Sequence, residues 1–240
     1  MYAGKLNTDE YGKEAEKIST VVIPLGSVEA HGRHCPLDTD NMIPERILRD
    51  VEGVMRQEIL VAPPINYGYT PGLSTFPGTV TIGMETLISL YTQVAAGYVG
   101  WGARHIVFMN GHGGNIPALS AACDNIAARG AYAMVISYWL NFSQDILTVC
   151  SAQGHAGEDE TSLVLAIDPS LVDMGKASSW EKKPLITPMN GPDMASRRIP
   201  EAVTGDARKA DRKKGDALYR ILRDRTVETI RAFAAGEYVR

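Results

Sequence analysis

The chain has 240 residues, of which 45% are hydrophobic and 22% charged, and this composition is typical of a single globular α/β domain spanning residues 1–240. Its formal net charge of −4, without a long run of basic residues, argues against a nucleic-acid partner, and no apolar run reaches the roughly 18 residues of a membrane span. The three cysteines have no paired spacing, so we expect no disulfide framework and a cytoplasmic location.

Residues 20–26 are the first predicted strand. Their sequence, TVVIPLG, is apolar and β-branched, which is typical of a strand covered on both faces. Asp40 is expected to cap the helix that follows, because apolar residues then recur at helical spacing. Residues 59–65, ILVAPPI, predict a second strand. The Gly- and Pro-rich residues 67–80 predict a loop.

The rest of the chain continues to alternate between helical and strand-like segments. We expect helices over residues 84–102, 116–130, 158–167 and 207–235. We expect strands over residues 104–110 and 131–139. Residues 176–204 hold four prolines and little periodicity, which predicts a surface excursion or an active-site flap.

This alternation predicts an α/β fold. Right-handed crossovers between the strands would give a mostly parallel sheet with helices on both faces. Ligands of such folds bind beyond the carboxyl ends of the strands. The functional residues are therefore expected just after residues 20–26, 104–110 and 131–139.

Side chains that can bind metals follow two of these strands. Glu29, His31 and Asp40 come after the first strand, and His112 follows the second within NGHGGN. Imidazole and carboxylate are the ligands of Zn²⁺, Mn²⁺ or Fe²⁺ in hydrolytic sites. Glu29 and His31 would point the same way in an extended segment, and the carboxylate of Asp40 could bridge two ions about 4 Å apart. A lone histidine is usually an ordinary polar residue, but this combination predicts a metal centre.

A third group of candidates lies in residues 154–162, GHAGEDETS. His155, before the expected helix, could move protons during catalysis. Glu158 is a candidate catalytic residue, although the helix dipole alone also favours an acid in a first turn. Glu160 could reach inward as a further metal ligand.

Candidates for substrate binding come from the same strand ends. Gly113 and Gly114 could form a tight turn or cradle an anion, and we interpret them as letting the backbone approach a bound substrate. Trp139 and Tyr138, with the Gly- and Pro-rich loop, would shape the pocket, or they could be ordinary core and rim packing. His34 could be a metal ligand, support a ligand or contact the substrate, and we place it outside the direct ligands.

The chain resembles the creatininase (creatinine amidohydrolase) family in four motifs. They are LGSVEAHGRHCPLDTD, FPGTVTI, NGHGGN and HAGEDETSLVLAIDPSLV, in the family's order. The resemblance implies a three-layer α/β/α sandwich, a homohexamer and two divalent metal ions per chain, whether Zn, Mn or Fe. By this resemblance, Glu29, Asp40 and His112 would hold one ion. His31 and the shared Asp40 would hold the other, and His155 would handle the proton.

Two positions depart from the family's creatininase. Creatininase has a glutamate at the position of Gly114, and that glutamate binds the second ion, so either Glu160 or a water would replace it here. Creatininase also has a lid tryptophan at the position of Ser151. Without that ring, stacking on planar creatinine would be weak.

These observations predict a metal-dependent hydrolase that uses a metal-activated water on a small cyclic amide or formamide-type substrate. One alternative on the same scaffold is hydrolysis of a C–C bond in a cyclic polyol ketone of the 3-dehydro-scyllo-inosose type. Another alternative is a non-enzymatic member that binds a ligand. The expected partners are a small-molecule substrate and further copies of the chain.

Overall fold

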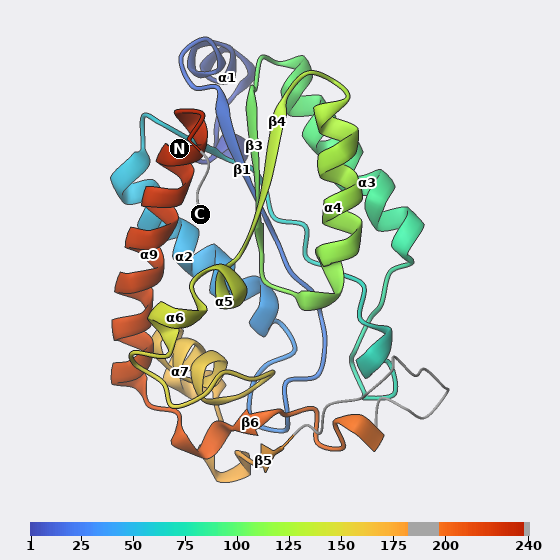
Figure 1. The fold of residues 1–240 in the computed structure, drawn as a ribbon, viewed down its shortest axis with the longest axis vertical. Coiled ribbons are helices and arrows are strands. Elements are labelled where there is room, and N and C mark those ends of the chain that lie inside the picture. The colour runs from blue at the N-terminus through green and yellow to red at the C-terminus, as the bar shows by residue number, and fades with distance from the viewer. Residues whose placement is uncertain (182–196, 238–240) are drawn as a thin grey trace.

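Four parallel strands form the main sheet of the computed structural model, which describes residues 1–181 and 197–237 (Figure 1). The strands are β1 (Thr20–Leu25), β2 (Leu60–Val61), β3 (His105–Asn110) and β4 (Tyr132–Ser137). Their order is β2-β1-β3-β4, and every neighbouring pair is parallel. Leu25 pairs with Asn110, and Asn110 pairs with Ser137, so β1, β3 and β4 end level with one another. The polar segments that follow these strands therefore start from one edge of the sheet.

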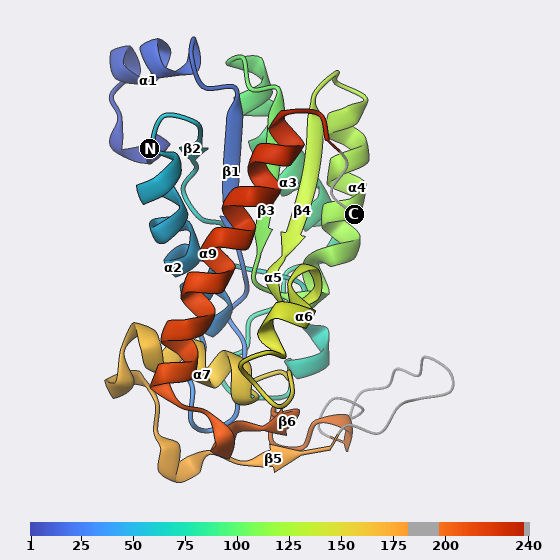
Figure 2. The same ribbon diagram turned by 60° about the vertical axis from the view of Figure 1, so that its left-hand side comes forward.

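Helices cover both faces of this sheet (Figure 2). One face is covered by α3 (Met84–Gly100) and α4 (Ile116–Ala127), and the other by α2 (Thr39–Met55), α7 (Glu158–Ile167) and α9 (Arg212–Ala234). Residues of β1 alternate between the two cores: Val21 and Ile23 pack with α3 and α4, whereas Val22 packs with α2 and α9. The predicted α/β fold, with a mostly parallel sheet between helical layers, is thus confirmed.

The second predicted strand is shorter than expected. β2 contains only Leu60 and Val61 of the predicted residues 59–65. Pro63 and Pro64 follow it, and neither has an N–H to donate to a neighbouring strand. The edge strand β2 therefore ends after two residues.

Among the α-helices whose bounds lie within the described residues, three short ones have no counterpart among the predicted elements. They are α1 (Thr8–Ala15), α5 (Tyr138–Asn141) and α6 (Ser143–Ile146). The sequence does carry a signal for α1, because Asn7 and Glu10 form a reciprocal capping box. α5 ends the predicted strand at 131–139 two residues early, at Ser137.

The two helices α7 and α9 cross at close range. α7 has the predicted bounds, but α9 starts at Arg212, after the predicted 207, because the Asp211 side chain caps it by accepting from Lys213 N. At the crossing, a Cβ added to Gly215 would lie 1.9 Å from the carbonyl oxygen of Ser162. Glycine therefore allows the backbones of the two helices to touch.

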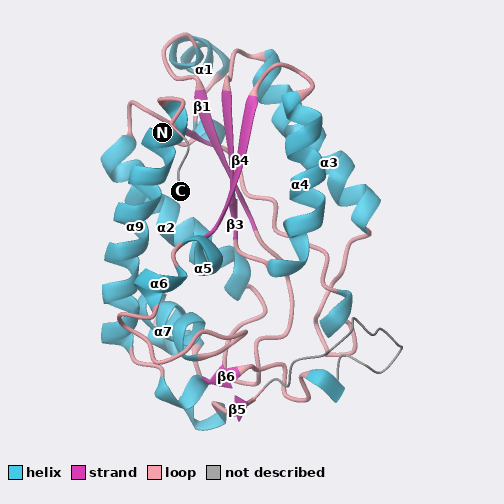
Figure 3. Cartoon of the chain, viewed as in Figure 1, coloured by secondary structure: helices cyan, strands magenta, loops and turns pink. Residues whose placement is uncertain are grey.

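A small antiparallel pair, β5 (Ser179–Trp180) with β6 (Gly205–Asp206), lies beyond the carboxyl edge of the main sheet (Figure 3). These strands flank most of the predicted flap at 176–204, of which residues 182–196 lie outside the described residues. Among the helices described, none is both long enough and apolar enough to cross a membrane.

Candidate metal centre

A cavity of about 700 Å³ lies at the carboxyl edge of the main sheet. Its walls come from the segments that follow β1, β3 and β4, as the sequence predicts, and from residues 69–73 of the Gly- and Pro-rich loop. The lining includes Glu29, Asp40, His112, His155 and Glu160. Five predicted site residues from four separate segments therefore meet here.

His112 directs one ring nitrogen at two carboxylates. Its Nδ1 lies 2.9 Å from Asp40 Oδ2 and 3.2 Å from Glu29 Oε1. Its Nε2 lies 2.9 Å from the carbonyl oxygen of Tyr69, to which it can only donate. That bond favours the neutral tautomer with a lone pair on Nδ1, as a metal-binding histidine requires.

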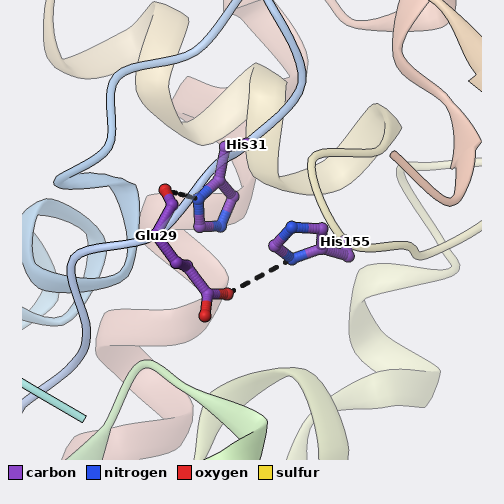
Figure 4. A group of neighbouring side chains, drawn as sticks. All are labelled: Glu29, His31 and His155. Carbon is purple, nitrogen blue, oxygen red and sulfur yellow. Dashed lines mark hydrogen bonds and ion pairs between the residues drawn. The ribbon is translucent and has the colours of Figure 1, made fainter. Parts of the chain in front are cut away.

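His31 is arranged in the same manner. It is fully buried, and its Nδ1 lies 3.1 Å from the backbone oxygen of Glu29 (Figure 4). Its Nε2 lies 3.0 Å from Asp40 Oδ1 and 3.6 Å from Glu160 Oε2. The geometry toward these oxygens is poor for hydrogen bonding, so this buried nitrogen has no hydrogen-bond partner among the residues that the structure describes. Once its proton is displaced, this nitrogen has a lone pair that faces two carboxylates, which suits a cation between them.

Asp40 lies between the two histidines, with one oxygen facing each. The predicted cap of α2 is wrong: Asp38 occupies the cap position, and Asp40 lies in the first turn, where its side chain faces the cavity. Ser27 Oγ donates to Asp40 Oδ2 at 2.8 Å. Cβ atoms added to Gly26 and Gly111 would lie 2.3 and 1.9 Å from the backbone oxygen of Asp40. The ends of β1 and β3 thus fix this residue by direct backbone contact.

The cavity residues include three carboxylates that are buried close together. Glu29, Asp40 and Glu160 are all at most 9% exposed. Burial disfavours a charged imidazole, but the nearby carboxylates, Asp40 first among them, outweigh it and raise the pKa of His31 to about 10. Burial also raises the pKa of Glu160, and Asp40 adds to that rise. Carboxylates packed this closely need positive charge beside them, which protons or a divalent cation can supply.

Three groups in the described part of the chain could each hold a metal ion, with ligand atoms within 4.8 Å of one another. They are Glu29 with Asp40 and His112, His31 with Asp40 and Glu160, and Glu29 with His31 and His155. The first two share Asp40. The first has the residues expected for one ion, and the second adds Glu160, one of two candidates, to the expected His31 and Asp40. The donor atoms are imidazole nitrogens and carboxylate oxygens, the set that Zn²⁺ and Mn²⁺ accept.

His155 packs against His31, with 4.3 Å between the ring centroids (Figure 4). Its Nε2 lies 2.8 Å from the backbone oxygen of Ala30, and its Nδ1 lies 3.6 Å from Glu29 Oε1. Burial and the neighbouring His31 lower the pKa of His155 to about 4. The ring is therefore neutral near pH 7, with Nε2 facing the Ala30 carbonyl oxygen and Nδ1 facing Glu29.

A family model described as "Creatininase: Creatinine amidohydrolase" matches residues 4–230. The chain belongs to the creatininase family. Members of this family are hydrolases, and the match covers every segment that contributes to the cavity.

Relatives and solved structures within the creatininase family agree with this assignment. A mycofactocin precursor peptide peptidase of Mycobacterium ulcerans (strain Agy99) is 32% identical over 245 residues, which cover 97% of this chain and 93% of the relative. A creatinine amidohydrolase of Pseudomonas putida is 28% identical over 254 residues, with 96% of each chain covered. The structure named "Creatininase Mn" superimposes with a TM-score of 0.86 at 26% identity, covering 96% of this chain and 97% of that one.

Glu158 does not line the cavity. Its buried carboxylate lies 2.6 Å from Lys214 Nζ and accepts from both the backbone N–H and the hydroxyl of Ser151. Burial raises its pKa, but Lys214 and Ser151 outweigh that effect and hold the pKa below its usual value. The predicted catalytic role is therefore not supported by position, and Glu158 instead joins α7 to α9. Ser151 is engaged in the same contact.

Two predicted substrate contacts also lie elsewhere. Tyr138 is fully buried in the core beside α9, and it does not reach the cavity. His34 is 2% exposed, and its Nε2 lies 2.9 Å from Thr161 Oγ1. These placements correct both predictions, because neither side chain can touch a substrate. Trp139 does line the cavity, as predicted.

The glycines of the NGHGGN segment differ from each other in role. Gly113 and Gly114 both line the cavity. A Cβ on Gly114 would lie 1.9 Å from the backbone oxygen of Tyr69, so this glycine makes room for the carbonyl group that orients His112. A Cβ on Gly113 would meet only Trp139, at 3.9 Å, so this position faces open space. The predicted approach of backbone to substrate fits Gly113 alone.

Thr70 and Asp159 are polar cavity residues that were absent from the sequence-based set. The hydroxyl of Thr70 donates to Glu29 Oε2, and Asp159, which is 1% exposed, accepts from Gly154 N at 3.0 Å. Burial raises the pKa of Asp159. A lone threonine in a loop carries no signal in the sequence, whereas Asp159 stands in the acidic run that supplied Glu160.

Proposed function

We propose that this chain is a metal-dependent amide hydrolase with two divalent cations per chain. One cation would be held by Glu29, Asp40 and His112, and the other by His31, Asp40 and Glu160. The observation that carries the proposal is the placement of Asp40, whose two oxygens lie 2.9 and 3.0 Å from one nitrogen of each histidine. Glu160 takes the place of the ligand that Gly114 cannot provide.

The side chains around this centre have separate tasks in the proposal. Divalent cations, when bound, supply Lewis acidity and lower the pKa of a bound water. Thr70 orients the Glu29 carboxylate by hydrogen bonding to Oε2. His155 accepts a proton at Nδ1 and returns it to the leaving nitrogen, while Ala30 O holds its other nitrogen in place.

We propose a short peptide as the substrate, in preference to the small cyclic amide or formamide expected from the sequence. Two observations support this choice. The cavity of about 700 Å³ is much larger than a single five-membered ring such as creatinine needs. Pockets of this size commonly hold drug-sized ligands, and a short peptide is of that size. The relative named as a peptide peptidase is also more similar, at 32% identity, than the one named creatinine amidohydrolase, at 28%.

The activity test uses protein loaded with Mn²⁺ or Zn²⁺ and the same protein after treatment with a chelator. The substrates are a set of short peptides, creatinine and a cyclic polyol ketone. We expect metal-dependent release of new amino groups from the peptides. Turnover of creatinine alone would reject the peptide, and formation of a carboxylate from the ketone without amine would indicate C–C hydrolysis. Turnover that survives complete removal of metal would reject the whole proposal.

The metal test compares His112→Ala with His105→Ala by elemental analysis. His105 stacks on Tyr132 at 5.5 Å, outside the cavity, and it is the matched control. We expect about two ions per chain in the wild type and in His105→Ala, and a loss of at least one ion in His112→Ala, with activity falling by more than about 100-fold. Equal metal content in the two variants would contradict the assignment, and a metal-free wild type would support a non-enzymatic protein.

A further inference from the structure

A second cavity, of about 490 Å³, lies between α2 and α9, and it shares no lining residue with the metal centre. Four arginines line it, two from each helix: Arg46, Arg49, Arg220 and Arg223. We call it the arginine pocket. Only two lining residues, Asp50 and Asp216, are acidic. This concentration of positive charge stands out in a chain whose net charge is −4.

Two of the four guanidinium groups remain free to bind a ligand. Arg46 lies 3.2 Å from Asp50, and Arg223 lies 2.8 Å from Asp224, so these two are already paired. Arg49 and Arg220 are exposed and make no ion pair or side-chain hydrogen bond to any residue that the structure describes. Guanidinium groups left in this state at the mouth of a cavity attract anions.

Tyr219 lines the arginine pocket beside Arg46. It is 3% exposed, and its ring stacks under Arg46, with 4.7 Å between the guanidinium carbon and the ring centroid. Its hydroxyl is buried without a hydrogen-bond partner in the described residues. Burial raises the pKa of Tyr219 well above its usual value, so the hydroxyl keeps its proton. The ring of Tyr219 thus lines the pocket and holds the guanidinium of Arg46 in place.

We propose that the arginine pocket binds the dianionic phosphate group of a small molecule. Two free guanidinium groups match the charge of a phosphate monoester near neutral pH, and the planar fork of each can bind two phosphate oxygens. A single carboxylate would leave one guanidinium unmatched. The pocket is local to one helix pair, so it fits a compact ligand.

The test measures binding of inorganic phosphate and phenyl phosphate to the metal-loaded protein by calorimetry. Arg49→Gln and Arg220→Gln remove the free guanidinium groups at exposed positions, and Arg212→Gln is the matched control, an exposed arginine of α9 outside the pocket. Each pocket variant is expected to weaken binding about tenfold or more, and the control is expected to bind as the wild type does. Melting temperatures of all variants confirm that they fold.

Phosphate could also bind at the metal centre, so the same titration is repeated with His112→Ala. Phosphate binding that survives in His112→Ala and is lost in Arg49→Gln with Arg220→Gln supports the arginine pocket. Binding that is lost in His112→Ala and unchanged in the arginine variants overturns it. Succinate and acetate serve as carboxylate probes, and tighter binding of either than of phenyl phosphate would overturn the assignment to phosphate. Because these readouts need no turnover, they are independent of the proposed hydrolase activity.

Discussion

Thr70 reaches the buried carboxylate of Glu29 from 41 positions along the chain. The contact matters because a carboxylate that binds a cation through one oxygen must be held through the other. Glu29 is also in contact with His112 and His155, at 3.2 and 3.6 Å, so any rotation of its side chain would disturb both partners. The precision of the centre therefore depends on a hydroxyl that is not itself among the proposed ligands.

Thr70→Val tests this dependence at the scale of a residue. The substitution keeps the shape of the side chain and removes the hydroxyl, so we expect metal affinity or activity to fall by about 10- to 100-fold. Thr148→Val is the matched control, because the Thr148 hydroxyl donates to the backbone oxygen of Asp145 at an exposed position. Competition with a chelator of known affinity provides the measurement, and wild-type affinity in Thr70→Val would show that the contact is dispensable.

At the scale of elements, only one face of each helix reaches the cavity, and this decides which side chains can act as metal ligands or line the site. Glu158 and Glu160 are two positions apart on α7, and such residues point in different directions around a helix. Glu160 faces the cavity, and Glu158 faces Lys214 on α9. Tyr138 and Trp139 are likewise adjacent, and only Trp139 lines the cavity. The direction that α7 faces is set by its packing against α9, which begins only at Arg212.

The contact between α7 and α9 predicts a specific cost for one substitution. Gly215→Ala would place a methyl group 1.9 Å from the carbonyl oxygen of Ser162, which forces the helices apart. We expect a loss of about 1–3 kcal/mol in the free energy of unfolding.

Gly97→Ala is the matched control for this substitution. A Cβ at Gly97 within α3 would meet nothing within 4 Å, so alanine there should stabilise the protein by up to about 1 kcal/mol. Urea denaturation measures both variants. The same change in stability for both would refute a role for the crossing.

At the scale of the whole molecule, the sequence predicts which segments meet at the edge of the sheet. It predicts less well which way each side chain in those segments points. Parallel strands that end level bring Glu29, Asp40 and His112 together, and this follows from the alternation of strands and helices. The pairing of Glu158 with Lys214 spans 56 positions, and no local pattern encodes it. Strand propensity also fails to predict the short helix α5 at Tyr138–Asn141, because its residues continue an apolar run. Long-range packing decides these details.

The proposed cations would join segments that follow β1 and β3 to α2 and α7, so their removal should affect global stability. We expect chelation to lower the melting temperature, because a bound ligand at about 1,000 times its Kd stabilises a protein by about 4 kcal/mol. The carboxylates raise the pKa of His31 and of His112, so each ring holds a proton below its raised pKa and a cation must displace it. Metal affinity should therefore fall as pH falls.

This pH dependence can be measured by titrating the protein with Zn²⁺ in buffers between about pH 6 and pH 8. Each displaced proton should weaken binding up to about tenfold per unit of decreasing pH. Calorimetry in buffers of different ionisation enthalpy counts the protons released. An affinity that stays constant over this range would show that these two histidines carry no proton when the metal binds.

The contact of Gly26 and Gly111 with the backbone of Asp40 has a consequence for protein design. Because two strand termini abut the opening turn of α2 without any intervening side chain, the bridging carboxylate is located by main-chain atoms. Transplanting this centre into another scaffold would therefore mean moving two strand termini and a helix start as one rigid block, since copying the donor residues alone would leave the bridge unplaced.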